Sequence, residues 1–482
     1  QTMRPWFVPR LLVDPDGEWQ RRIGAAGPLV VTGMRGCGKT MLLRSLQFHA
    51  RASGEEGEPT SADVLDRLRQ DGYVGLYVSC NRLLDGLGKP KNEELHEPYT
   101  RLFLCYAREA LQAIRHLVEI GGRDAVIPVA PRPIAETIAA LVSGSTLSGN
   151  ESVAALERRI HEMLRSLESG GDDYRLTSNP TIAMPQLATA VTQCSEVWAG
   201  AQVLFLLDDV STRHLHEESI RKLLSTLMFA SDVCAFKVTT EAQTLELVLK
   251  SPGLVEKARI GRDYDAFDLA SAIHRKLRES GGRAGREFVA QVLQHRANLL
   301  ASHPHRTPRE IMGDQPLVEI ARNIVASTET SPDRKNVYFG MSALAAVCVG
   351  DIGDVISIYE LILSRAGRVD SAPVASKVQS SAFQEFCSRR LYHLNRRQGR
   401  LKQFADGFAN AAHDLLIESA RRNPDRLRDY ASIYVRVTTG DVDLQLQQLR
   451  ELMDAGVFVL TGGPDAPRTK ARDSDPLAQY TL

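Results

Sequence analysis

The sequence predicts an α/β protein with a parallel sheet, followed by a mainly helical C-terminal part. Short apolar runs alternate with helical segments over the first 270 or so residues, and such alternation is typical of parallel sheets. The run Val203–Leu207 is apolar at every position, which indicates a central strand buried on both faces. The expected strands lie at 28–32, 73–80, 203–207, 233–238 and 264–269.

Length and composition narrow the class of protein. A chain of 482 residues suggests two to four domains, and its 59 basic and 59 acidic residues argue against a uniformly basic nucleic-acid-binding surface. A local basic patch stays compatible with that balance. The seven cysteines are scattered without a C-x-x-C pair, so we expect reduced thiols, no zinc site and a cytoplasmic protein.

Membrane association and export are not expected from the sequence. The longest apolar stretches, such as Met341–Val349, are too short to span a bilayer. Arg4, Pro5 and Trp6 stand where a signal peptide needs an apolar core. The chain opens at Gln1 and stops in a strand-like segment, which is compatible with a piece of a longer protein.

A glycine-rich loop follows the first predicted strand and precedes a helix predicted from Met41 to His49. Residues 33–40, GMRGCGKT, fit G-x-x-x-x-G-K-[ST], the loop whose backbone N–H groups cradle phosphates. Lys39 is expected to reach the β- and γ-phosphates of ATP, and the Thr40 hydroxyl to bind Mg²⁺. A chance match in a glycine turn is the alternative. The expected nucleotide-binding loop residues are Gly33, Gly36, Cys37, Gly38, Lys39, Thr40 and Met41.

An acidic pair closes the apolar strand at 203–207. Asp208 is expected to hold Mg²⁺ and Asp209 to polarise the attacking water, which makes Lys39, Asp208 and Asp209 the candidate catalytic residues. The alternative is that Asp209 caps the following helix. Because aspartate is shorter than the glutamate of many hydrolytic ATPases, turnover is expected to be slow.

Two further pairs of residues are candidate functional residues, and each pair has a simpler structural alternative. Thr239 and Thr240 end the next strand, where they either sense the γ-phosphate or form an ordinary turn. Arg259 and Arg262 precede the last strand, where they are either arginine fingers for a neighbouring subunit or solvated surface residues.

At these residues the chain resembles the AAA+ and STAND branch of P-loop ATPases, and most of all the origin-recognition initiator-like ATPases, including bacterial relatives found near antiviral defence genes. Phe7-Val8-Pro9-Arg10 is similar to the family's adenine-contacting box, so Phe7 and Arg10 are implied nucleotide contacts. Leu206–Val210 resembles the Walker B of STAND switches, and Val238–Thr240 their sensor strand. Gly350–Asp354 stands where a second sensor is expected, but its arginine is missing.

The resemblance implies a P-loop ATPase core at 1–270, a helical lid at 271–370, and a helical, winged-helix-like domain at 371–482. A helical segment at about 82–183 is expected to be an insertion into the core. Beyond the core we expect helices and two wing strands. They lie at 287–301, 316–326, 352–364, 375–397, 401–421 and 442–454, with strands at 457–461 and 478–482.

The C-terminal region is the candidate DNA contact. Gly399 is expected to end the helix that carries the first four members of a basic cluster, so the last two need not continue its face. The cluster is Arg389, Arg390, Arg396, Arg397, Arg400 and Lys402. They either meet phosphates or form a solvated helix face, and the predicted winged helix either binds DNA or packs on the core.

Two functions are therefore carried forward. The first is a regulatory ATPase switch that binds ATP and Mg²⁺ and controls self-assembly or a protein partner. The second is an ATP-dependent DNA-binding initiator or loader. A housekeeping enzyme with a small-molecule substrate lacks a second catalytic constellation to support it.

Overall fold

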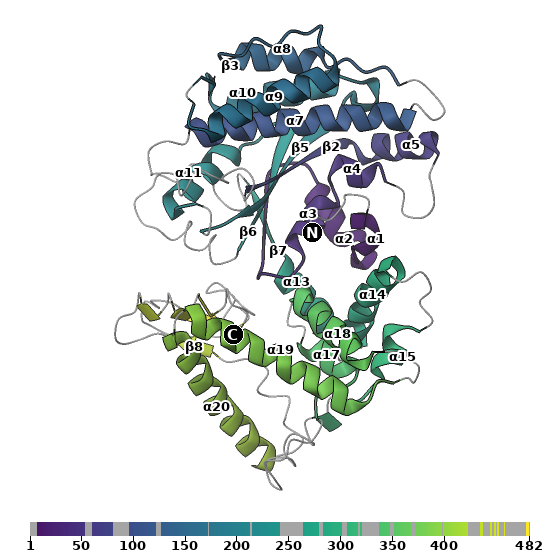
Figure 1. Cartoon of the computed structure of the whole chain (residues 1–482), viewed down its shortest axis with the longest axis vertical. Helices are drawn as coiled ribbons and strands as arrows, with labels where there is room; N and C mark the ends of the chain where they lie inside the picture. The colour runs from purple at the N-terminus through teal and green to yellow at the C-terminus, as the bar shows by residue number, and fades with distance from the viewer. Residues whose placement is uncertain are drawn as a thin grey trace. The chain divides into compact units, whose positions relative to one another are not determined.

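The chain forms two compact units in the computed structural model (Figure 1). Unit 1 comprises Gln1–Gly33 and Lys39–Asp268, and unit 2 comprises Met34–Gly38 and Leu269–Leu482. The structure describes residues 7–53, 60–80, 96–121, 127–171, 173–212, 215–241, 264–278, 283–300, 306–316, 319–320, 337–347, 351–367, 373–397 and 399–422, with short pieces at 434–436, 444–445, 448–449, 451–452, 457 and 479–481.

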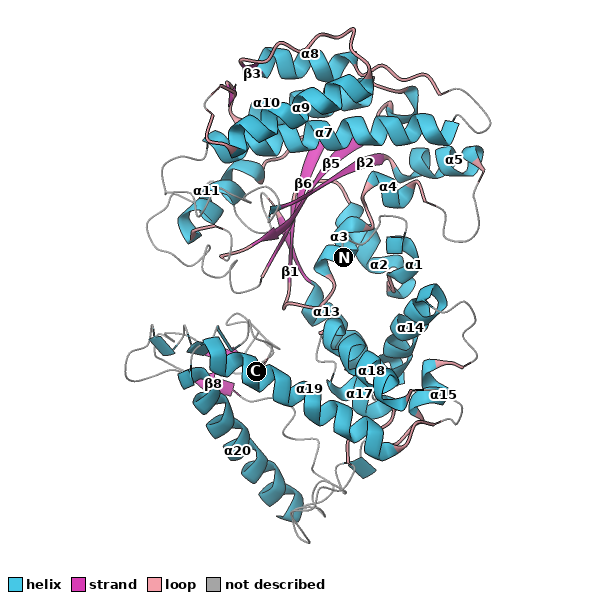
Figure 2. Cartoon of the chain, viewed as in Figure 1, coloured by secondary structure: helices cyan, strands magenta, loops and turns pink. Residues whose placement is uncertain are grey.

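A five-stranded sheet organises unit 1, and all of its neighbouring strands run parallel (Figure 2). The strand order is β2-β5-β6-β1-β7. This confirms the predicted fold class. The strands are β1 Leu29–Thr32, β2 Tyr73–Ser79, β5 Gln202–Val210, β6 Cys234–Thr240 and β7 Asp265–Asp268.

Four helices come from the segment predicted to be an insertion and its continuation; α7 and α10 pack on the sheet, and α8 and α9 pack on these two helices. α7 contacts β2 and α9, and α10 contacts β5, β6 and α8; Figure 1 shows α7 lying across the strands. Their apolar faces and the sheet share one buried core, so this segment builds the core itself. A small antiparallel pair, β3 with β4, joins the same region. The bounds are α7 His96–Gly121, α8 Arg132–Leu141, β3 Val142–Ser143, α9 Val153–Glu168, β4 Arg175–Leu176 and α10 Pro180–Gln193.

The helix predicted at Met41–His49 is wrong in its length. α3 ends at Arg44, and a separate short helix, α4, spans Phe48–Arg51. The Ser45 hydroxyl donates to the Leu42 carbonyl at 2.7 Å, a local bond that competes with helix continuation. Gln47 is then extended, with φ −60° and ψ 137°. The remaining elements of unit 1 are α1 Val8–Leu11, η2 Pro15–Gly17, α2 Glu18–Gly24, α5 Ser61–Asp71, η3 Glu196–Trp198 and α11 Glu217–Leu227.

A buried lysine ties the start of β1 to β6. Lys237 donates from Nζ to the carbonyls of Ala25 and Gly27, at 2.5 and 2.7 Å, and burial lowers its pKa to about 8. The two carbonyls belong to the turn that leads into β1. Their bonds to a cation therefore hold that turn against the centre of the sheet.

Unit 2 is helical over most of its described residues. α13 packs on α14, α18 on α19, and α19 on α20. The buried Gln379 side chain links three segments: it donates to the carbonyls of Met312 and Val374 and accepts from the Gly340 N–H. The helices are α13 Leu269–Arg278, α14 Arg283–Leu300, α15 Pro308–Met312, α17 Met341–Val347, α18 Ile352–Ala366, α19 Ser376–Arg397 and α20 Gly399–Arg422.

The winged helix stays a prediction. Of its two expected strands, the one at 478–482 is present as β9 Gln479–Thr481. β9 pairs in antiparallel fashion with β8 Tyr434–Arg436, a strand that the sequence did not suggest. Residues 458–461, and most of the helix expected at 442–454, lie outside the described residues.

Close packing of β2 on the α3–α4 turn gives a first prediction. A Cβ added to Gly75 would overlap the carbonyl group of Leu46, lying 2.8 Å from its carbon. We expect Gly75→Ala to lower the stability of the folded chain by about 1–3 kcal/mol, since backbone must move. The matched control is Gly24→Ala, whose Cβ would meet the Leu46 side chain at an ordinary 3.8 Å. Thermal unfolding of both variants is the measurement, and equal midpoints would contradict the clash.

Candidate nucleotide-binding site

The glycine-rich loop connects β1 to α3, in the strand–loop–helix order that the motif needs. Gly33, Gly36 and Gly38 have φ values of +144°, +83° and +97°, which side chains rarely tolerate. Lys39 starts α3, and its Nζ turns back to donate to the Gly33 carbonyl at 2.8 Å. A phosphate oxygen is a stronger acceptor for a lysine ammonium than a neutral carbonyl, so a bound phosphate would compete with Gly33 for Lys39.

The other loop residues differ in exposure. Thr40 is exposed and Met41 half-buried, while the Cys37 side chain is buried. Thr40 thus offers an accessible hydroxyl at the first turn of a helix.

Asp208 is the centre of the acidic end of β5. The residue is 3% exposed, and its carboxylate accepts from the Thr239 hydroxyl at 2.5 Å and from the Tyr77 hydroxyl at 2.7 Å. These donors come from β6 and β2, the two strands that flank β5. Tyr77 was not foreseen; the register that pairs Ser79 with Asp208 places it beside the acidic pair.

Asp209 has an unusual backbone. Its φ is +61°, a left-handed conformation that aspartate tolerates better than most residues. A register irregularity between Leu207 and Val210 accompanies it, and its N–H donates to the Thr239 hydroxyl at 2.8 Å. The alternative that Asp209 caps the next helix is wrong, because His216 occupies the N-cap position of α11.

The two threonines lie beside this acidic pair. Thr239 bonds both to Asp208 and to the Asp209 N–H, and Thr240 donates to the Val210 carbonyl at 2.6 Å. Both are buried. Nearby Cys80 has a pKa raised to about 12, by burial first and then by the Asp209 and Asp208 charges, so its thiol stays protonated and unreactive.

The predicted adenine-contacting box forms the start of α1. Val8 is buried, Phe7 is half-buried at the N-cap, and Arg10 is exposed. The arginine-finger candidates Arg259 and Arg262 lie outside the described residues.

Within unit 2, the loop apex contacts the first turn of α18. The Gly353 N–H donates to the Gly36 carbonyl at 3.2 Å, and a Cβ on Gly36 would lie 2.5 Å from Cγ of Asp351. Asp351 is the N-cap of α18, and its Oδ1 accepts from the Asp354 N–H at 3.0 Å. Asp351 belongs to the segment in which the expected second-sensor arginine is missing, and its carboxylate lies against the loop.

Arg390 of α19 pairs with both carboxylates of this acidic turn and offsets part of their charge. It pairs with Asp351 at 3.2 Å and with Asp354, and it stacks over the Phe386 ring at 5.3 Å. Burial and the Asp351 charge raise the pKa of Asp354 to about 7, although Arg390 opposes the shift. Sequence reasoning grouped Arg390 with a DNA-contacting cluster and missed this role, because its partners lie 36 and 39 residues away.

The described members of that basic cluster are engaged in ion pairs. Arg389 pairs with Glu385, Arg390 with the α18 carboxylates, and Lys402 with Asp406 at 3.7 Å. The helix carrying the first two ends at Arg397, as the glycine at 399 suggested. The side chains of Arg396, Arg397 and Arg400 lie outside the described residues.

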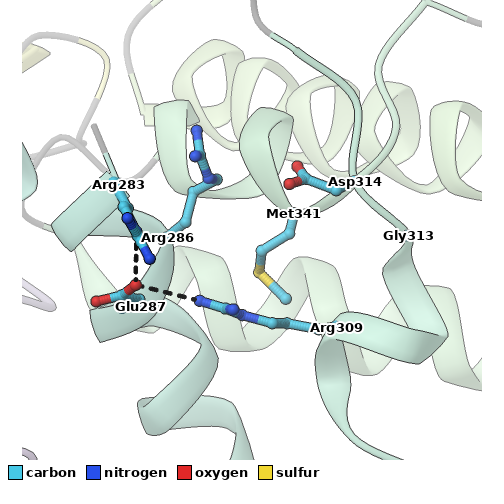
Figure 3. A pocket seen from close by; sticks show the side chains of 7 residues that line it. All are labelled: Arg283, Arg286, Glu287, Arg309, Gly313, Asp314 and Met341. Atoms are coloured by element: carbon cyan, nitrogen blue, oxygen red, sulfur yellow. Dashed lines mark hydrogen bonds and ion pairs between the residues drawn. The ribbon is translucent and has the colours of Figure 1, made fainter. Parts of the chain in front are cut away.

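Unit 2 also holds a hollow of about 250 Å³, which Figure 3 shows. The Glu287 carboxylate forms ion pairs with Arg283 at 3.2 Å and with Arg309 at 4.0 Å. Two of the three arginines that line the hollow therefore already share one carboxylate. The lining residues are Arg283, Arg286, Glu287, Arg309, Gly313, Asp314 and Met341, and none belongs to the glycine-rich loop.

The donors at the sheet edge suit a hard cation. Mg²⁺ prefers carboxylate, hydroxyl and phosphate oxygens, and Asp208 and Thr40 supply the first two. Elsewhere, the described residues contain no group of three histidine, cysteine or acidic side chains able to hold a metal. None of the described helices combines the length and the apolar character that a membrane span requires.

A phosphate-type glycine loop after a parallel strand, with an aspartate pair at the same sheet edge of which Asp208 is buried, defines a P-loop nucleotide-binding protein. The family model described as ORC-CDC6-like matches residues 1–329. The chain belongs to the ORC-CDC6-like family, and is an origin-recognition-like AAA+ ATPase by class. Among solved structures it is similar to the ORC2 protein of Aeropyrum pernix, solved as ADPNP-ADP complexes, at 13% identity and a TM-score of 0.36, over 94% of this chain and 90% of that one. No curated protein matches the chain.

The Thr239 hydroxyl gives a prediction for the site. In Thr239→Val the shape is kept, but the buried Asp208 carboxylate and the Asp209 N–H both lose a partner. We expect stability to fall by about 1–3 kcal/mol, measured by urea unfolding. Thr239→Ser keeps the hydroxyl and should stay much closer to the parent protein. A valine variant as stable as the serine variant would show that these bonds contribute little.

Proposed function

We propose that this protein is a nucleotide-dependent switch that binds ATP with Mg²⁺ and hydrolyses it slowly. One observation carries the proposal: Thr239 bridges Asp208 and Asp209 at the sheet edge from which the glycine loop leaves. The carboxyl ends of parallel strands are where α/β proteins place their ligands.

The residues of the glycine loop and of the acidic strand end have separate roles in the proposed site. The loop amides and Lys39 bind the phosphates, and Thr40 and Asp208 hold Mg²⁺, which neutralises phosphate charge. Thr239 and Tyr77 fix the Asp208 carboxylate by donating to its two oxygens. Phe7 and Arg10 are the proposed contacts to the base. Thr239 and Thr240 are the proposed sensors of the γ-phosphate, a role in which each hydroxyl exchanges its present acceptor, Asp208 or the Val210 carbonyl, for a phosphate oxygen.

Slow hydrolysis follows from Asp209. Its side chain is one methylene shorter than glutamate, and its backbone is held in the left-handed region by the Thr239 hydroxyl. A short, constrained carboxylate has little freedom to follow an attacking water. Long-lived bound ATP is what a switch for assembly or for a protein partner requires.

The DNA-loading alternative has less support in the described residues. Arg389, Arg390 and Lys402, which were candidates for phosphate contact, are paired with carboxylates. Charges that are already neutralised release few counterions from DNA. A protein partner or a second copy of the chain is therefore the proposed target.

One prediction from the proposed function concerns ATP binding. Lys39→Ala removes a cationic partner of the phosphates and should weaken ATP binding by about ten- to a hundredfold. The control is Lys222→Ala, which removes a half-exposed lysine of α11 paired with Glu218 at 3.9 Å and should bind ATP as the parent does. Titration calorimetry with ATP and Mg²⁺ measures both. Unchanged affinity in Lys39→Ala would remove the site assignment.

Another prediction concerns hydrolysis and the nucleotide-dependent change of assembly. Asp209→Asn should keep ATP binding and slow hydrolysis by about a hundredfold, because asparagine tolerates the left-handed backbone but activates water poorly. Size-exclusion chromatography in the presence of ATP, ADP or duplex DNA then measures the assembly state of the Asp209→Asn variant, in which bound ATP should persist. We expect the mass of Asp209→Asn to differ between ATP and ADP, and Lys39→Ala to show no such difference.

Two results would contradict these expectations. Hydrolysis at the parent rate in Asp209→Asn would remove its catalytic role. ATP-dependent retention of DNA that weakens steeply with salt, without a change in protein assembly, would favour the loader.

A further inference from the structure

The apex of the glycine loop is covered by acidic side chains within unit 2. Asp351 lies against Gly36 so closely that Gly36 has no room for a side chain, and the Gly36 carbonyl accepts from Gly353 at 3.2 Å. Ile352 also approaches Gly38, with its Cδ1 3.9 Å from an added Cβ. The first turn of α18 and the phosphate-binding loop are thus in direct contact.

The charge of this turn is held in place by three groups. The Asp351 and Asp354 side chains are only 10% and 16% exposed, and Arg390, which is 28% exposed, pairs with both. Two carboxylates share the one guanidinium of Arg390, so acidic groups outnumber basic groups at this turn. The Asp351 carboxylate lies against the loop, at a distance where charges interact strongly.

Two anions compete at this point. The loop amides are suited to phosphate oxygens, and ATP brings several negative charges to them. A fixed carboxylate against Gly36 repels those charges, and the electrostatic cost is larger in a partly buried site than in water.

We propose that Asp351, anchored by Arg390 and Asp354 at the N-terminus of α18, is an anionic latch on the phosphate-binding loop. The latch lowers the affinity for ATP, and ATP binding moves the first turn of α18 away from Gly36. This rests on the proposed function, because it assumes that the loop binds a nucleoside triphosphate. Its consequence is that nucleotide occupancy reaches α18, and through Arg390 also α19.

The test removes the carboxylate while keeping the helix cap. Serine and asparagine are both good N-cap residues, so Asp351→Ser and Asp351→Asn should preserve α18. We expect each variant to bind ATP about tenfold more tightly than the parent, since one repulsive charge is removed. Asp406→Ser is the matched control: it also removes an ion-paired aspartate of unit 2, that of Lys402, and should leave affinity unchanged.

Hydrogen exchange supplies an independent readout. In the parent protein, ATP should speed the exchange of the Gly353 amide in the first turn of α18, because this amide donates to the Gly36 carbonyl of the loop. Ligand binding usually slows exchange, so an acceleration confined to this turn is specific to a latch that opens. Thermal unfolding midpoints check that all variants are folded.

The outcomes separate the two proposals. If the parent protein does not bind ATP, the proposed function fails, and the latch fails with it. If the parent binds ATP but Asp351→Ser and Asp351→Asn bind no more tightly, or more weakly, the latch is overturned while the nucleotide site stands. Tighter binding by serine alone would show that the aspartate acts by its size, which also overturns an anionic latch.

Discussion

The interaction on which unit 1 depends is the buried carboxylate of Asp208 with its two hydroxyl donors. Thr239 lies on β6 and Tyr77 on β2, so three adjacent strands meet at one charged group. A carboxylate removed from water is stable only while its oxygens are bonded. The register of the strands and the position of the acidic pair are therefore fixed together, and the same bonds aim Asp208 at the edge where the glycine loop begins.

The parts of this arrangement that depend on local sequence could be predicted. The buried strands show as apolar runs, and the loop as GMRGCGKT, because burial on both faces and a positive φ restrict which residue types can stand there. Tyr77 and Arg390 could not be found in this way. Tyr77 lies 131 residues from Asp208, and neither residue carries a local pattern that names its partner.

The helical segment between the glycine loop and β5 shows a different limit of prediction from sequence. The sequence predicts helices there at 99–120, 131–141, 152–167 and 184–197, close to the observed α7, α8, α9 and α10. Apolar faces with helical periodicity make such helices predictable. What periodicity cannot say is which surface each face covers. α7 and α10 bury theirs on β2, β5 and β6, in one core with the sheet, so a segment expected to be an insertion supports the strands that carry Tyr77, Asp208 and Thr239.

The start of α18, where the expected arginine is missing, lies close to the glycine loop. A Cβ on Gly353 would lie 3.0 Å from Oδ1 of Asp351, a tight approach, and at an ordinary 3.6 Å from Cα of Gly36, so a side chain there would press on the aspartate. Gly36 has the same restriction from the opposite side, with φ +83° and Asp351 beside it. Two glycines facing one aspartate let backbone meet backbone, and the cation at this point comes from Arg390 on another helix. A guanidinium delivered from α19 makes the charge next to the loop depend on where α19 lies, which an arginine within α18 would not do.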